Sequence, residues 1–237
     1  MVLRVNLFVY NDSSFDKVLS RISEDIKNLK KHLSNFPETE AKKAIDLNTK
    51  LGWALTANMD IFTYRKALSL ITPGSVNQLF YEYYTNNDLV NLKAEFDEIK
   101  TRIPDELKSL MDQCISCFLR GDWHITIPSL LIIVEGLIAM FLKTNKNSSY
   151  LLSHWEKKIN QKENQLTYAL SVSLHEYISN SLFVYKNFKE DRGEGINRNW
   201  ILHGRDTPDL WKDIDSIKLF ILISALLFVF EKDEIIK

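Results

Sequence analysis

Apolar residues recur every three or four positions along most of this chain, which is the spacing of α-helices. In 15–33, for example, Val18, Ile22, Ile26 and Leu29 share one helical face. Residues 1–10 differ, because apolar residues occupy their odd positions. That period of two is typical of a short strand or an extended arm. The pattern therefore predicts an all-α fold with a possible short N-terminal strand.

Breaks in the pattern, rich in proline, glycine and polar residues, separate the predicted helices. The break at 102–104 is the best candidate for a domain boundary. We therefore predict a mostly helical N-terminal region of unknown role over 1–103 and a helical bundle over 104–237. The helices expected in the N-terminal region span 15–33, 39–48, 61–70, 75–84 and 88–99. Those expected in the bundle span 104–119, 126–142, 151–159, 166–188, 196–203 and 208–232.

Composition narrows the class of protein. The chain has 237 residues, and its formal charge of −1 provides no general attraction to nucleic acid, so RNA binding would need a local basic patch. The longest apolar run, 219–230, is shorter than the roughly 20 residues that span a bilayer. The first residues of the sequence show no signal-peptide pattern. We expect a cytoplasmic protein that does not enter a membrane.

Two features of the bundle have competing interpretations. Cys114 and Cys117 form a lone Cys-x-x-Cys without a second pair of zinc ligands, so we interpret them as one face of a buried helix and expect no metal or cofactor. Glu135 stands among apolar residues, and a buried carboxylate is costly unless it is paired. Its partner is either Arg198 or Asn199, or else a backbone N–H or another basic side chain.

The segment Arg198-Asn199-x-x-x-His203-Gly204 carries the strongest candidate chemistry. On a helix Asn199 and His203 share a face, whereas Arg198 and His203 lie about 140° apart. An imidazole can accept or donate a proton near neutral pH, and a guanidinium binds phosphate through two hydrogen bonds. Gly204 suits the C-terminal cap of this helix. Because one copy separates Arg198 from His203 and offers one histidine, two copies of the helix would complete a site.

This segment, followed by a polar turn and a long apolar helix, resembles the HEPN superfamily of all-helical ribonucleases and RNA-binding domains. The region from Gln113 to Phe141, with its Gly-Asp-Trp turn, is similar to the front half of bacterial HEPN proteins. The resemblance covers about 100–237. It implies a HEPN-type bundle and a homodimeric cleft in which Arg198, Asn199 and His203 cleave RNA without a metal. If Glu135 pairs with Arg198, it would hold the arginine in place.

Two functions remain open at this point. One is a metal-independent endoribonuclease, acting as a toxin or anti-phage defence effector with RNA as substrate and an antitoxin or defence protein as a possible partner. The other is a non-catalytic HEPN-like module that binds RNA or protein and dimerises; there, Arg198 would bridge to Glu135 and His203 would cap a helix. The basic side chains expected around an RNA cleft are Lys186, Lys189, Arg192, Arg205 and Lys212.

Overall fold

The computed structural model describes residues 38–159, 165–193 and 195–235, which belong to one compact unit. The predicted strand at 1–10 and helix at 15–33 lie outside these residues. Within them every regular element is helical, so the all-α prediction is confirmed for this part of the chain. The α-helices are α2 (Glu38–Lys50), α3 (Ile61–Lys66), α4 (Pro73–Arg102), α5 (Asp105–Leu119), α6 (Trp123–Leu142), α7 (Ser148–Ile159), α8 (Gln165–Tyr177), α9 (Arg198–Leu202) and α10 (Asp213–Ile235). The shorter turns are η1 (Ala67–Ser69), η2 (Ile178–Leu182) and η3 (Pro208–Leu210).

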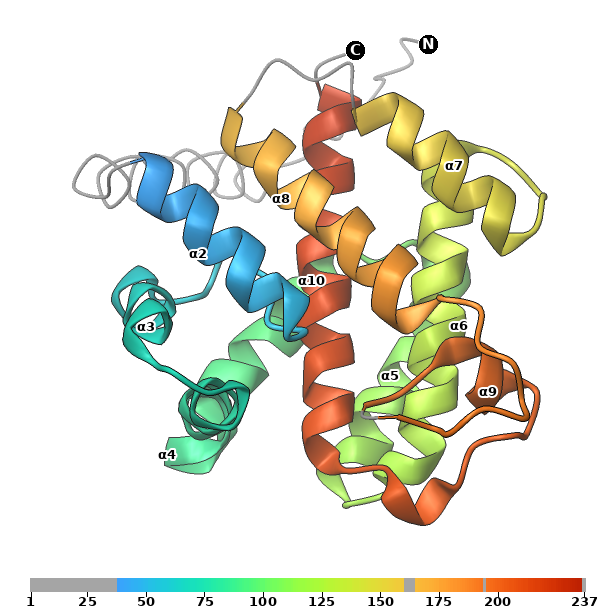
Figure 1. The fold of residues 1–237 in the computed structure, drawn as a ribbon, viewed down its shortest axis with the longest axis horizontal. Helices are drawn as coiled ribbons and strands as arrows, with labels where there is room; N and C mark the ends of the chain where they lie inside the picture. Colours follow the sequence, from blue (N-terminus) through green and yellow to red (C-terminus); the bar gives the residue numbers. More distant parts are fainter. Residues whose placement is uncertain (1–37, 160–164, 194, 236–237) are drawn as a thin grey trace, which may run out of the picture. The chain divides into compact units, whose positions relative to one another are not determined.

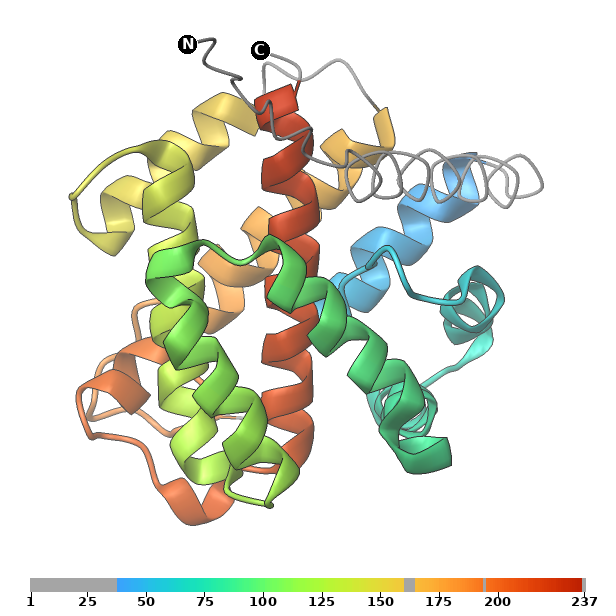
Figure 2. The same cartoon turned by 180° about the vertical axis from the view of Figure 1, so that it is seen from behind.

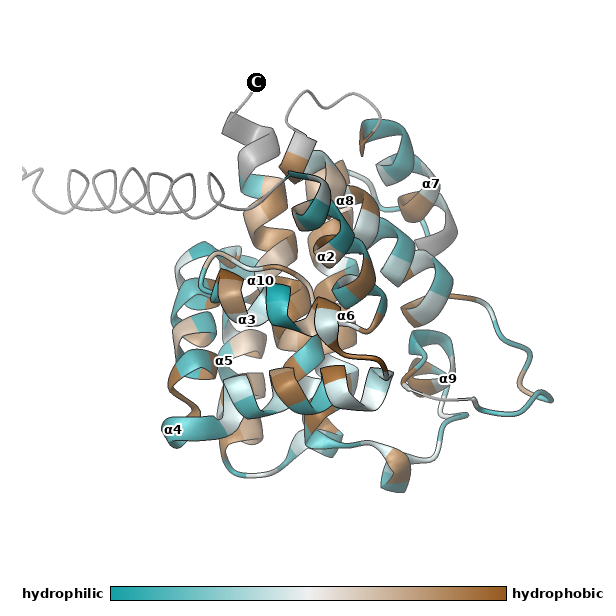
Figure 3. Cartoon of the chain, turned by 60° about the vertical axis from the view of Figure 1, so that its left-hand side comes forward, coloured by the Kyte–Doolittle hydropathy of each residue, from teal (hydrophilic) through white to brown (hydrophobic). Residues whose placement is uncertain are grey.

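Helix α10 is the centre of the bundle. Its residues from Ile217 to Val229 are almost all buried, on every side of the helix, which is the pattern of a helix enclosed by others. It packs against α4, α6 and α8 (Figures 1 and 2). The apolar colouring of α10 and the mixed colouring of the helices around it reflect this arrangement (Figure 3).

The N-terminal helices complete the same unit. Trp53, in the turn after α2, stacks on Phe80 and Tyr84 of α4, with ring centroids 5.2 and 6.0 Å apart. All three side chains are fully buried, so these aromatic residues form core contacts. Helix α2 packs against α8, and α4 packs against α10. The boundary expected at 103–104 coincides with the turn between α4 and α5, inside the compact unit.

Helix α6 differs from its prediction in length. It begins at Trp123 rather than near residue 126, so Pro128 lies in its second turn instead of its first. Its 20 residues are long and apolar enough to cross a membrane by length and composition, although half of that window is buried inside the bundle. Core helices pass the same test, and α6 packs against α5, α7, α9 and α10. Its polar side chain Glu135 faces α9, where the candidate site begins.

The helix predicted at 166–188 ends early. Helix α8 stops at Tyr177, and η2, a π turn, continues it only to Leu182. The carbonyl of Val184 accepts a hydrogen bond of 2.9 Å from the Asn197 side chain, and that of Lys186 accepts one of 3.1 Å from the Trp200 indole. In a helix those carbonyls would accept from the backbone four residues later. Side chains of the next segment therefore take the place of the helical backbone donors, and they hold residues 184–186 in an irregular conformation beside α9.

A buried carboxylate joins α4 to α10. Glu95 is fully buried and accepts hydrogen bonds from the hydroxyls of Thr56, at 2.5 Å, and Ser224, at 2.7 Å. No cation pairs with it in the described part of the chain. Burial raises its pKa from 4.5 to about 7, since a desolvated carboxylate favours its neutral form.

Glu95 should therefore make stability depend on pH. Because the pKa of Glu95 is higher in the folded state, Glu95 contributes its full stabilisation of the fold below pH 4.5. That contribution is lost as the pH rises through about 7. At about 1.4 kcal/mol per pKa unit, this is about 3 kcal/mol between pH 4.5 and pH 8. We expect Glu95→Gln to raise the melting temperature at pH 8 relative to wild type, on the order of 6–12 °C, and to change it little at pH 5.

Thermal denaturation at both pH values checks this, with Glu106→Gln as the control because Glu106 is an exposed glutamate of α5. If the difference in melting temperature between Glu95→Gln and wild type were the same at pH 5 and pH 8, the interpretation of Glu95 would be wrong.

Candidate functional site

The Arg198–His203 segment forms a short, firmly anchored helix. Asn197 caps α9 by accepting a hydrogen bond from the Trp200 backbone N–H at 3.1 Å, and its amide group holds Val184 as described above. The indole of Trp200 is buried against the 183–188 segment. At the other end Gly204 has a φ of +63°, as the cap prediction requires. The helix itself is shorter than predicted, covering Arg198–Leu202, with His203 as its C-terminal cap residue.

Arg198 is paired with Glu135, the partner expected from the sequence. Its Nη2 donates to Glu135 Oε2, which links α9 to α6. The guanidinium also lies 5.6 Å from the centre of the Phe183 ring, within range of a cation–π contact. The pair is half-buried, with side-chain exposures of 21% for Arg198 and 23% for Glu135, so the carboxylate is less buried than its apolar neighbours in the sequence indicated. Glu135 and Phe183 together fix the direction in which the guanidinium points.

His203 faces a different group of side chains. It is exposed, and its ring centre lies 6.0 Å from that of Phe188. Arg205 stands over the same Phe188 ring at 5.5 Å. Asn199 is half-buried, and its carbonyl accepts a 3.2 Å hydrogen bond from the His203 backbone N–H. One copy therefore directs Arg198 toward α6 and His203 toward Phe188, as the angular separation on a helix predicts.

The loops on either side of α9 are tied together by Asp206, a residue that the sequence analysis missed. Its carboxylate is 2% exposed and accepts from Arg192 Nε at 2.5 Å and from the Trp211 indole at 2.8 Å. It also accepts from the Thr207 backbone N–H at 2.9 Å. Arg192, expected as an RNA-binding cation, is thus engaged in an internal ion pair. No periodicity relates residues 192 and 206, so the sequence carries no signal for this contact.

The other basic residues expected around the site do not form one patch. Arg205 lies beside His203 through Phe188, and Lys189 is exposed on the same segment. Lys186, Arg192 and Lys212 instead line a separate cavity. Among the five basic residues predicted to bind RNA, Arg205 is therefore the one that contacts the same ring, Phe188, as His203.

Three acidic residues lie around the start of α10: Asp209 is exposed before it, whereas Asp213 and Asp215 stand in its first turn and are half-buried. Asp213 accepts a hydrogen bond of 2.6 Å from the Tyr81 hydroxyl, and this bond connects α10 to α4. Asp215 is half-buried, and burial raises its pKa. It accepts from the Lys212 backbone N–H at 2.9 Å, as a residue in a first helical turn can. Thr207 and Pro208 lead into the short turn η3, so the helix predicted from residue 208 begins only at Asp213.

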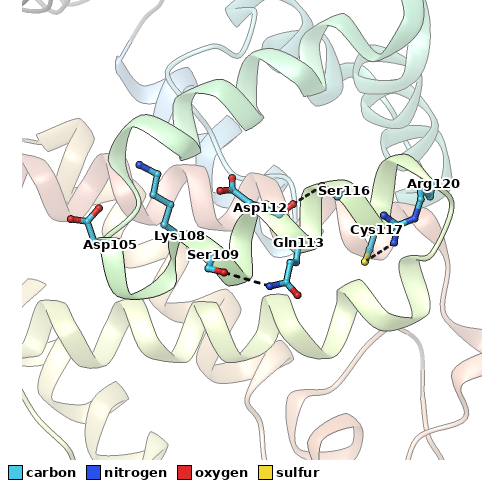
Figure 4. A pocket seen from close by; sticks show the side chains of 8 residues that line it. All are labelled: Asp105, Lys108, Ser109, Asp112, Gln113, Ser116, Cys117 and Arg120. Carbon is cyan, nitrogen blue, oxygen red and sulfur yellow. Dashed lines mark hydrogen bonds between the residues drawn. The ribbon is translucent and has the colours of Figure 1, made fainter.

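A depression of about 650 Å³ along α5 is a poor candidate for a site. Every residue that lines it belongs to α5 or its ends, and the side chains fan out along one helix (Figure 4). Cys117 is half-buried here beside Arg120, and Cys114 is buried, with its pKa raised to about 11 by burial. Among the described residues no group of three histidine, cysteine or acidic side chains is placed to hold a metal.

Comparisons with known proteins add no relative: no family model, no curated protein and no solved structure matches this chain.

Proposed function

We propose that this protein is a metal-independent endoribonuclease of HEPN type that acts as a homodimer. The observation that carries the proposal is the arrangement of α9. Its arginine is oriented by Glu135 and Phe183, and its histidine is exposed at the other end beside Phe188 and Arg205. An oriented cation and an accessible proton carrier on one rigid element are what RNA cleavage without a metal requires.

In the proposed reaction the 2′-hydroxyl of RNA attacks the adjacent phosphorus atom. His203 of one copy removes the hydroxyl proton, and His203 of the second copy gives a proton to the departing 5′-oxygen. Arg198 stabilises the negative charge that builds up on the phosphate oxygens. The bond that forms is O2′–P and the bond that breaks is P–O5′, so the products end in a 2′,3′-cyclic phosphate and a 5′-hydroxyl. Asn199 would hydrogen-bond the phosphate or the imidazole.

The dimer is supported by an apolar surface on α6 next to the Arg198–Glu135 pair. Ile125 and Ile132 are 66% and 50% exposed, and Met140 is 39% exposed. Ile125 and Ile132 are seven residues apart and therefore share a face, and Glu135 lies at its edge, three residues after Ile132. An apolar strip of this kind on a helix commonly marks a contact with another protein surface. A second copy placed there would bring two α9 helices together.

We expect Ile132→Asp to weaken the dimer at least about a hundredfold, because a two-fold interface places the substitution twice in an apolar contact. Light scattering at micromolar concentration measures the result. The matched control is Ile71→Asp, since Ile71 is 97% exposed in the connection between η1 and α4. A wild-type protein that is monomeric under these conditions would remove the dimer from the account.

A non-catalytic HEPN-like binding module is the second candidate. The observation in its favour is that Arg198 already has a carboxylate partner, as expected of a residue that joins two helices. A cleavage assay on total RNA in the presence of EDTA separates the two candidates, since only the first requires activity without metal. Toxin or anti-phage activity, with an antitoxin or defence protein as partner, belongs to the first candidate, which would place the chain in the cytoplasm.

A further inference from the structure

A cavity of about 690 Å³ lies where the end of α2, the start of α4, the π turn η2, residues 184–193 and 195–196, and the start of α10 meet. We propose that this cavity binds a small ligand that carries a diphosphate group. Arg198, Asn199 and His203 are not among its lining residues, so the proposal stands independently of RNA cleavage. The charged side chains that line it are Lys50, Lys186, Arg192, Lys212 and Lys218, together with one described carboxylate, Asp215.

Part of this positive charge has no carboxylate at ion-pair distance. Lys50 pairs with Asp46 at 2.7 Å, and Arg192 pairs with Asp206 at 2.5 Å. The other three cations, Lys186, Lys212 and Lys218, form no ion pair with any residue that the structure describes. Because Asp215 is the one described carboxylate in the lining, the recess keeps an excess of positive charge, which concentrates anionic ligands.

Lys218 is held in a defined position within this group. A β-carbon on Gly52 would lie 2.9 Å from Lys218 Cδ and 3.0 Å from the Tyr177 hydroxyl, so the glycine leaves room for the lysine stem. The ammonium group lies 5.2 Å from the Trp53 ring centre. Lys218 is half-buried, and burial lowers its pKa to about 8 against the opposing effect of the Asp215 carboxylate. A partly desolvated ammonium without a carboxylate at ion-pair distance is stabilised when an anion binds.

The shape and charge of the cavity define the ligand class. Its volume falls in the range of roughly 300–1,000 Å³ that holds small molecules. Lys186, Lys212 and Lys218 enter the cavity from three parts of the chain, which suits a ligand with acceptor oxygens spread over more than one group, and a diphosphate supplies them in a compact form. The N-terminus of α10 adds little, because Asp213 and Asp215 already accept from the Ile214 and Lys212 N–H groups. The lysine side chains therefore provide the recognition.

Calorimetric titration of the whole chain with pyrophosphate tests the proposal. We expect binding to wild type, and an affinity about tenfold weaker for Lys218→Gln and for Lys212→Gln, the loss typical of one charge-assisted contact. Lys108→Gln is the matched control, because Lys108 is an exposed lysine of α5 that does not line this cavity. Lys212 is exposed, so its replacement leaves the fold intact even if Lys218→Gln does not.

Parallel titrations with a nucleoside diphosphate and with a short single-stranded RNA show which kind of phosphate-bearing ligand the cavity binds. Binding of pyrophosphate or of the nucleoside diphosphate that both cavity variants weaken supports the proposal. It is overturned if neither small ligand binds at about 1 mM, if only the RNA binds, or if Lys108→Gln weakens binding as much as the cavity variants do.

Discussion

Replacing His203 by alanine is expected to lower RNA cleavage by about 10²–10⁴-fold, the usual contribution of a group that transfers protons in the reaction. The side chain is exposed at the end of α9 beside the Phe188 ring, so its removal should leave folding and melting temperature nearly unchanged. Arg198→Ala should abolish cleavage as well. The measurement is the cleavage rate on a defined RNA with EDTA present.

His124→Ala is the matched control for this experiment, because His124 is an exposed histidine in the first turn of α6. It should cleave RNA at the wild-type rate. Equal rates for wild type and His203→Ala would refute the catalytic role of His203 and leave the binding module as the better account.

Loss of the Glu135 carboxylate should have the second-largest effect on activity. In Glu135→Gln the side chain keeps its size but no longer fixes the Arg198 guanidinium by charge, and displacement of a catalytic group by about 1 Å can cost up to about a hundredfold in rate. Its effect on stability should be modest, about 1–3 kcal/mol, because both partners are about one-fifth exposed. Glu135→Leu should reduce both activity and stability, since it leaves the arginine without a hydrogen-bond acceptor there.

Glu98→Gln is a fitting control for Glu135→Gln. Glu98 forms another half-buried ion pair, with Arg102 at 2.5 Å on α4, and it lies outside the α9 segment. Cleavage rates and urea denaturation of both variants separate the two effects. If both variants lost stability to a similar degree and neither lost activity, Glu135 would be a structural residue only.

Local patterns in the sequence predicted much of the fold. The helices expected at 104–119 and 151–159 correspond to α5 and α7, whose apolar periodicity is uninterrupted. The helices expected at 75–84 and 88–99 correspond to the two halves of α4, which loses helical geometry from Asn86 to Leu89. Helical spacing alone placed these elements, because each buries one continuous face against the bundle.

What the sequence did not predict depends on contacts between distant residues. The predicted helix to residue 188 was wrong because Asn197 and Trp200 bind the carbonyls of Val184 and Lys186, and propensity carries no information about such partners. Asp206 was missed for the same reason. The Glu135–Arg198 pair, 63 residues apart, was among the alternatives that the sequence offered, because a carboxylate amid apolar neighbours needs a partner and the motif supplies a cation.

The basic cavity could not be predicted from the sequence either. Lys50, Lys186 and Lys218 come from α2, from the segment after η2 and from α10, and no spacing in the sequence relates them. Lys186 and Lys212 were grouped with an RNA cleft because they are close to the motif in sequence. In the fold they line a different recess, together with residues of α2 and α10.

The chemistry of the RNA ends tests the central claim most directly. The purified wild-type protein is incubated with a defined RNA in EDTA, and the new ends are identified by mass spectrometry. The account predicts fragments with a 2′,3′-cyclic phosphate and a 5′-hydroxyl, produced by wild type and absent with His203→Ala. Fragments with a 5′-phosphate, cleavage that EDTA abolishes, or no cleavage at all would contradict it.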